Sequence, residues 1–142
     1  MSAGGFTPGN FIYYVASACD EISMNPSGDV NLIGLSMRVP FIRGTFDKLE
    51  IRSEFPGRGD YKTARFMYTQ TEMTPAQREM SVWLLDSLMD QMVQGIADSR
   101  GKQAEEVRNL VDRAPFLGQE SVEVGLVDRL EDWGAFTKRL ED

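Results

Sequence analysis

Histidine is absent from this chain of 142 residues, which removes the side chain that most often activates a serine hydroxyl. Cysteine occurs once, at Cys19, so neither an internal disulfide nor a cysteine metal cluster can form. Lysine and arginine are not clustered and the net charge is −7, which argues against a nucleic-acid partner. A serine/lysine pair remains possible as catalytic machinery, and we expect neither a cofactor nor a metal.

The composition is that of an ordinary globular chain, with 42% hydrophobic and 26% charged residues. The length is enough for one domain with a modest core, and we expect a single domain over residues 1–142. Cys19 lies within an apolar run over residues 15–22. We therefore expect a buried structural thiol at this position.

Strand and helix patterns alternate along the chain. Residues 12–22 read as a buried strand or as a helix, which periodicity does not separate. Residues 30–35 and 50–55 are predicted to form strands, whereas the apolar spacing over 41–49 predicts a helix, and a further helix is expected over 104–113. The alternation indicates an α/β fold.

The longest predicted helix begins after Thr74. The Thr74 hydroxyl is placed to accept the Gln77 amide as an N-cap, Gln77 completes the spacing of a capping box, and Gly101 ends the helix. An apolar stripe along it predicts packing in a core or a subunit interface, although its methionines also suit a flexible peptide-binding face. The stripe consists of Trp83, Leu84, Leu88, Met92 and Ile96.

Lys62 is the candidate catalytic residue. It follows a glycine-rich turn over residues 57–60 and stands between a tyrosine and small residues. Partial burial lowers the pKa of a lysine and allows it to act as a general base. The plainer interpretation is a solvated lysine in a turn. Of its neighbours, Asp60 is expected to shape the turn, and Thr63 is a candidate for orienting the amine.

Two runs of residues support Lys62 as the candidate catalytic residue. They are Tyr61-Lys62-Thr63-Ala64 and, about ten residues later, the run from Met73 to Glu79 that reads MTPAQRE. With these runs, the chain between Tyr13 and Asp128 resembles the bacterial signal peptide peptidase known as protease IV. In that family the lysine of the first run is the general base of a serine/lysine dyad, so the resemblance assigns this role to Lys62.

The resemblance also implies a fold, the ClpP/crotonase-like spiral of ββα units. That fold normally begins with several strands before the nucleophile turn, and these are missing here. We therefore expect a partial domain whose sheet edge needs another segment or chain to cover it.

The nucleophile is where the sequence departs from the family. Active halves carry a serine and two glycines directly before the tyrosine pair, but residues 10–12 here are Asn-Phe-Ile, followed by Tyr13. Long family members consist of a lysine-bearing half and then a serine-bearing half, and this chain resembles the first. The serine is therefore expected outside the chain. Ser17 and Ser23 lie close by in sequence but suit packing and capping.

The resemblance thus implies a fragment of a serine-type endopeptidase that degrades cleaved signal peptides and is inactive on its own. The expected partners are signal peptides or other hydrophobic peptides, the serine-bearing half of the enzyme, and further copies in a homo-oligomer. Family members are membrane-anchored in the cell envelope. No apolar run reaches the roughly 20 residues that cross a bilayer, and residues 1–5 resemble the start of a fragment, so we expect a soluble excised piece.

Two other functions remain open. One is a non-catalytic oligomerisation domain of the same fold, in which Lys62 forms an ion pair. The other is a crotonase-type acyl-CoA enzyme, although nothing specific to CoA is visible in the sequence.

Overall fold

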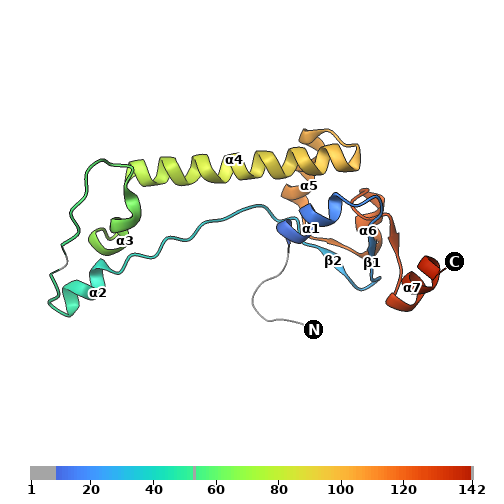
Figure 1. Ribbon diagram of the computed structural model, residues 1–142, viewed down its shortest axis with the longest axis horizontal. Coiled ribbons are helices and arrows are strands. Elements are labelled where there is room, and N and C mark those ends of the chain that lie inside the picture. The colour runs from blue at the N-terminus through green and yellow to red at the C-terminus, as the bar shows by residue number, and fades with distance from the viewer. Residues whose placement is uncertain (1–8, 53, 142) are drawn as a thin grey trace. The chain divides into compact units, whose positions relative to one another are not determined.

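The computed structural model describes residues 9–52 and 54–141 and is rich in helix, with a few short strands (Figure 1). The chain divides into two compact units. Unit 1 comprises Met1–Leu35 and Met89–Asp142, and unit 2 comprises Ser36–Leu88. The long helix α4 (Pro75–Arg100) belongs to unit 2 in its first part and to unit 1 in its second. Whether the units make up one domain stays a prediction.

Unit 1 contains helices and two pairs of short strands. Strand β1 pairs with β4 in parallel, with Ser23 opposite Arg129, and β2 pairs with β3 in the antiparallel sense, with Val30 opposite Phe116. Besides α4, its elements are α1 (Asn10–Ser17), β1 (Ser23–Met24), β2 (Asp29–Val30), α5 (Ala104–Arg113), β3 (Phe116–Leu117), α6 (Gly118–Glu123), β4 (Arg129–Leu130) and α7 (Trp133–Glu141).

An apolar core holds unit 1 together. Helix α5 shows how it forms, because Val107, Leu110 and Val111 follow the helical period and are all buried. The buried ring of Tyr13 reaches the core from α1 and donates its hydroxyl proton to the Leu126 carbonyl at 2.8 Å. Burial raises the pKa of Tyr13, so the phenol remains a donor. The other core residues are Val30, Leu32, Met92, Val93, Ile96, Ala97, Phe116, Leu126 and Val127.

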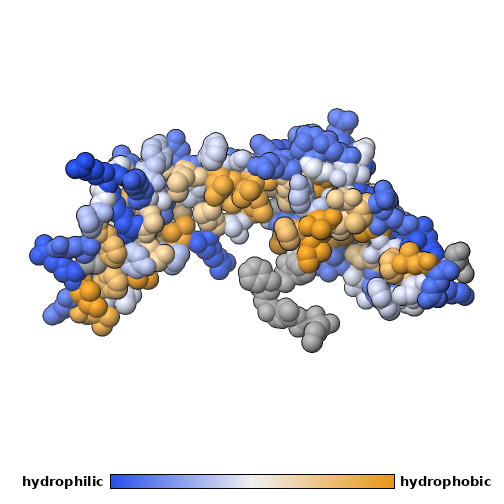
Figure 2. Space-filling view, viewed as in Figure 1, coloured by the Kyte–Doolittle hydropathy of each residue, from blue (hydrophilic) through white to orange (hydrophobic). Residues whose placement is uncertain are grey.

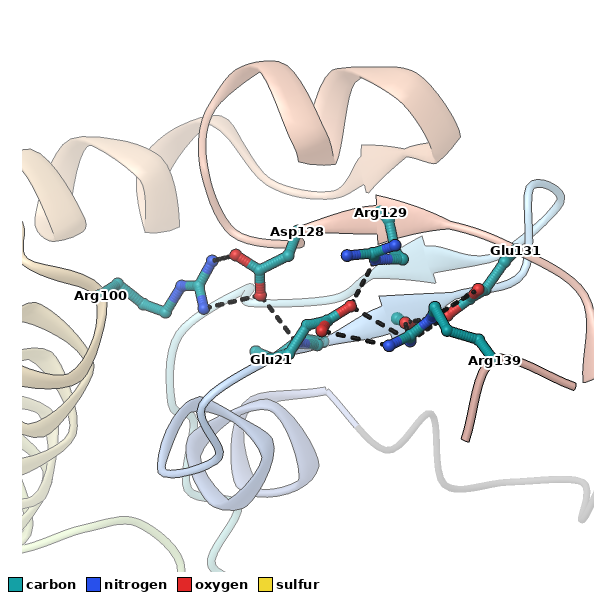
Figure 3. Close-up of polar contacts among 8 residues, drawn as sticks. Glu21, Arg100, Asp128, Arg129, Glu131 and Arg139 are labelled. Carbon is teal, nitrogen blue, oxygen red and sulfur yellow. Dashed lines mark hydrogen bonds and ion pairs between the residues drawn. The ribbon is translucent and has the colours of Figure 1, made fainter. Parts of the chain in front are cut away.

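Charged side chains reinforce unit 1 around β1 and β4 (Figure 3). Arg100 of α4 binds Asp128 through two guanidinium nitrogens, at 2.7 and 3.0 Å, and Asp128 also accepts the Ile22 amide at 2.7 Å. These donors, Arg100 first, hold the pKa of Asp128 below its usual range. On α7, Arg139 contacts Glu131 at 2.6 Å, and Arg139 and then the Ser23 hydroxyl lower the pKa of Glu131 to about 2. These contacts link helix α7 to β1 and to the segment after β4.

Unit 2 is built from short helices and irregular chain along its described residues, with helices α2 (Arg43–Lys48), η1 (Thr63–Arg65) and α3 (Phe66–Thr69) before α4. The Ile42 amide donates to the Met67 carbonyl at 2.8 Å. The Tyr68 ring stacks on Phe55 with centroids 4.8 Å apart and lies 6.2 Å from the ring of Phe46. Aromatic contacts, rather than strands, therefore bring these segments together.

Little of unit 2 is buried. Among its described residues only Phe66, Gln77 and Ser81 fall in the buried class, and two of these are polar. Figure 2 shows apolar side chains at the surface along α4. The exposed large apolar residues of the unit are Met37, Leu49, Ile51, Phe55, Tyr61, Met80, Val82, Trp83, Leu84 and Leu88.

Several expectations for helices are confirmed. The helix predicted over 104–113 is α5, and the one predicted over 41–49 is α2. Thr74 Oγ1 accepts the Gln77 amide at 3.2 Å at the start of α4, and Gly101 follows its end with a positive φ of 62°. The ambiguous segment over 12–22 contains helix α1, because Tyr13 and Ser17, one turn apart, are its buried residues.

Other expectations are wrong. The strand predicted over 30–35 is limited to β2, and none is present at residues 50–52 or 54–55, because alternation does not supply a partner strand. Cys19 is exposed, since it lies beyond the end of α1 and off its buried face. The prediction for the apolar stripe of α4 is confirmed as core packing at Ile96, which is fully buried, whereas packing of Trp83, 69% exposed, in a subunit interface stays a prediction. Residues 1–5, interpreted as a fragment start, lie outside the described residues.

Within the ranges that the structure describes, no helix combines the length and apolar character needed to cross a membrane.

Candidate functional site

Lys62 lies in unit 2 at the end of the glycine-rich turn and directly before η1. Gly59 adopts a φ of +85°, a conformation that glycine enters without strain, and the Lys62 amide points back to the Gly59 carbonyl at 3.5 Å. The Lys62 side chain is exposed, and its amine has no hydrogen bond or ion pair with any described residue. The partial burial expected of a general-base lysine is therefore not seen among the described residues, and the exposed side chain agrees with the plainer interpretation of a solvated lysine in a turn.

Tyr61 connects the turn to α4. Its hydroxyl donates to Glu79 Oε2 at 2.8 Å, joining residues that are 18 positions apart. Glu79 raises the pKa of Tyr61, first through this hydrogen bond and then through its charge, so the phenol keeps the proton that it donates. This contact was not predicted, although Tyr61 and Glu79 belong to the two runs that define the motif. The structure thus brings both runs together at one place.

Arg65 holds the other end of the turn. Its guanidinium lies so close to Gly57 that a β-carbon there would approach Nη1 to 2.3 Å. The guanidinium also lies over the Phe66 ring, 5.3 Å from its centroid, and Phe66 is buried. Thr63, the candidate for orienting the Lys62 amine, makes no hydrogen bond to it among the described residues, and Asp60 forms no ion pair with it there.

Gln77, at the centre of the second run, is 5% exposed. Its backbone amide is capped by Thr74, but its side-chain oxygen has no hydrogen-bond partner among the residues that the structure describes. The second bond of the predicted capping box, from the Thr74 amide to Gln77, is therefore absent there. A buried acceptor of this kind normally costs stability.

The serines near the expected nucleophile position serve structure. The buried Ser17 hydroxyl donates to the Tyr14 carbonyl at 2.8 Å. Ser23 contacts Glu131 and also accepts a bond from Arg139 at 3.2 Å. At residues 10–12, Asn10 Oδ1 accepts the Gly34 amide at 3.2 Å. These contacts agree with packing roles for both serines.

Unit 1 has a hollow of its own, with a volume of about 430 Å³. Ile22, Trp133 and Phe136 give it apolar walls, and the exposed Cys19 lies at its edge. Glu21 and Glu131 also line it, but both are paired with arginine (Figure 3). Its lining includes no lysine. The hollow therefore offers no base for a serine/lysine mechanism, and the Lys62 turn remains the better candidate.

Relatives of the chain are proteases by name. It is 30% identical over 115 residues to the chloroplastic serine protease SPPA of Arabidopsis thaliana, covering 81% of this chain and 17% of that protein. It is 28% identical over 117 residues to a putative protease of Synechocystis sp., covering 82% of this chain and 42% of that protein. Protease 4 of Salmonella typhi is 23% identical over 124 residues, covering 84% of this chain and 20% of that protein. The chain thus spans less than half the length of these relatives.

The family model of peptidase family S49 matches residues 8–142, nearly the whole chain. The match includes the Lys62 turn, the run around Gln77 and the core of unit 1. The chain belongs to peptidase family S49.

Proposed function

We propose that this chain is the lysine-bearing part of a serine-type endopeptidase of the signal peptide peptidase kind, with Lys62 as its general base and the nucleophilic serine on a segment outside the chain. The observation that carries the proposal is the exposed, uncommitted amine of Lys62 in a turn that is anchored at both ends. The membership of family S49 and the protease names of the relatives support the reaction class.

The proposed mechanism has two halves. The Lys62 amine, when neutral, takes the serine hydroxyl proton while the serine oxygen bonds to the substrate carbonyl carbon. Backbone amides stabilise the oxyanion, and the lysine then gives its proton to the amine that leaves as the peptide bond breaks. Water hydrolyses the acyl-enzyme by the same proton route. A lysine performs this role when water is excluded around it, so the segment that brings the serine would also cover Lys62.

The fold proposed for the complete domain is the ClpP/crotonase-like spiral of ββα units. The few short strands of unit 1 support a partial domain, since such a spiral contains longer paired strands. The exposed apolar residues of unit 2 support a covering partner, either the serine-bearing half or a second copy of the chain. The proposed substrates are signal peptides or other hydrophobic peptides, and the proposed location is the membrane of the cell envelope.

A second candidate function is a non-catalytic oligomerisation domain. The exposed apolar surface of unit 2 favours it, because such surface commonly marks an interface. That candidate assigns Lys62 to an ion pair, and no acidic partner contacts Lys62 among the described residues. The peptidase is therefore preferred.

The proposal is tested by replacing Lys62 in the full-length enzyme. Lys62→Ala should lower kcat/KM by two to four orders of magnitude, about 3 to 5 kcal/mol of transition-state stabilisation, at an unchanged melting temperature. Lys62→Arg should fail as well, because arginine stays protonated. Lys48→Ala, which removes another exposed lysine of unit 2, is the control and should leave activity unchanged. Near-normal activity in Lys62→Arg would overturn the assignment of Lys62 as the base.

A further inference from the structure

The turn that carries Lys62 has no core of its own. All of residues 57–62 are exposed, and Gly57 and Gly59 provide little conformational restraint. Such a segment would move freely unless other contacts held it. Catalysis by proximity requires the opposite, since a displacement of about 1 Å can cost a hundredfold in rate. The contacts that hold this turn therefore bear directly on catalysis.

Two contacts restrain the turn, one at each end. Arg65 packs against Gly57 at the first end and is itself braced on the Phe66 ring. At the other end, next to Lys62, the hydroxyl of Tyr61 donates to Glu79 at 2.8 Å. Glu79 belongs to the second turn of α4, a helix of 26 residues, so this end is tied to the most regular element of the chain.

We propose that Tyr61 and Glu79 form a clasp that positions the Lys62 turn on α4, and that both are positioning residues for the reaction. The inference rests on the proposed function of Lys62 as the base. Tyr61 directly precedes Lys62, so fixing the Tyr61 side chain limits where the Lys62 backbone lies. Neither residue of the clasp touches the reacting atoms in this account.

The chemistry of the pair suits a clasp. A tyrosine ring has only two side-chain rotations, so one hydrogen bond at its tip restrains the whole side chain. Glu79 raises the pKa of Tyr61, which keeps the donor proton in place at neutral pH. Both residues are exposed, so the bond is expected to position the turn without adding much stability.

The first arm of the test measures the clasp itself in this chain, by hydrogen exchange of the Lys62 amide, which points to the Gly59 carbonyl at 3.5 Å. Tyr61→Phe and Glu79→Ala should speed this exchange several-fold. Glu79→Gln keeps a neutral acceptor of the same shape and should retain most of the protection. Tyr68→Phe is the matched control, because its hydroxyl has no hydrogen bond among the described residues, and it should change nothing. Unchanged exchange in Tyr61→Phe would overturn the clasp.

The second arm measures turnover in the full-length enzyme. Tyr61→Phe and Glu79→Ala should each lower kcat by at least about tenfold with KM within twofold, since a displaced base slows chemistry and leaves binding intact. Their double variant should be no slower than the worse single variant, because both act through one contact. Glu79→Gln should retain most of the turnover, and Glu72→Ala, which removes a different exposed carboxylate of unit 2, should behave as wild type.

The two proposals fail in different ways. If Lys62→Ala is inactive but Tyr61→Phe and Glu79→Ala keep wild-type kcat, the clasp is overturned and the base assignment stands. If Lys62→Ala keeps activity, the base assignment fails, whatever the exchange of the turn shows. A rise in KM alone would assign the pair to substrate binding and would also overturn the positioning role.

Discussion

Units 1 and 2 differ in how much of their apolar surface they bury. Unit 1 buries an apolar core that includes the fully covered Leu32, Ile96 and Phe116, and it adds arginine–carboxylate pairs around β1 and β4. Unit 2 buries three of its described residues and leaves Trp83 69% and Leu49 63% exposed. The candidate base Lys62 is in unit 2.

The difference between the two units indicates that unit 2, rather than unit 1, needs a partner segment to cover its surface. Large exposed apolar side chains are costly in an isolated protein and typical of a surface that a partner covers. An exposed lysine is likewise a poor base until water is removed from it. One covering segment would bury the exposed apolar side chains of unit 2 and also exclude water from Lys62. Unit 1 already has a buried core and needs no such segment.

The largest expected effect concerns activity. Because the proposal gives the chain a base but no nucleophile, the chain should show no turnover of a hydrophobic peptide substrate, whereas the full-length protein should cleave it. A fluorophosphonate probe should label a serine in the full-length enzyme and none in the chain, as read by mass spectrometry. Labelling of Ser17, Ser23 or any other serine of the chain would contradict the division of roles.

The next effect compares the same substitution in the two units. Leu110→Ala removes a side chain that is 5% exposed in α5 and should cost about 2 to 5 kcal/mol of unfolding free energy. Leu84→Ala, in a helical position that is 39% exposed, should cost less than about 1 kcal/mol in the isolated chain. Urea denaturation measures both. Equal losses would mean that unit 2 has a core comparable to that of unit 1.

A smaller effect is expected from acid. The lowered pKa of Asp128 means that its pairing with Arg100 stabilises the fold above about pH 4, the usual pKa of aspartate, and that this stability disappears as the pH falls through the lowered value. Glu131, with its pKa of about 2, extends the loss toward pH 2. Melting temperatures between pH 5 and pH 2 should fall, and Asp128→Asn should make the fall shallower. The control Asp47→Asn, in the exposed pair with Arg43, should leave the slope unchanged.

The smallest effect concerns the buried acceptor of unit 2. Gln77→Met keeps the length of the side chain and removes an oxygen that has no partner among the described residues. The variant should be as stable as the wild type or more stable by about 1 kcal/mol. A loss above about 2 kcal/mol in urea denaturation would show that the oxygen of Gln77 is satisfied in solution.

Local rules predicted the local features of this fold. The pattern over 104–113 places Val107, Leu110 and Val111 on one face, and the helix formed with those bounds. Thr74 and Gly101 mark the ends of α4 because caps depend on neighbouring residues alone.

Features that depend on distant partners were missed. A strand needs a second strand, which the alternation over 50–55 does not provide, and the exposure of Trp83 depends on what is present to cover it. Lys62 was identified as a candidate from its sequence motif. The hydrogen bond between Tyr61 and Glu79 was not predicted, because no local rule joins positions 18 residues apart.

The most direct test of the account is the accessibility of the Lys62 amine, measured by acylation and mass spectrometry in the isolated chain and in the full-length enzyme. Lys48 is an internal reference, because it is also exposed and lies in the same unit. In the isolated chain both lysines should react to a similar extent. In the full-length enzyme Lys62 should be protected by at least about tenfold relative to Lys48, because the proposed serine-bearing segment would cover it. Equal reaction of Lys62 and Lys48 in the full-length enzyme would contradict the claim that this unit is completed by a partner segment.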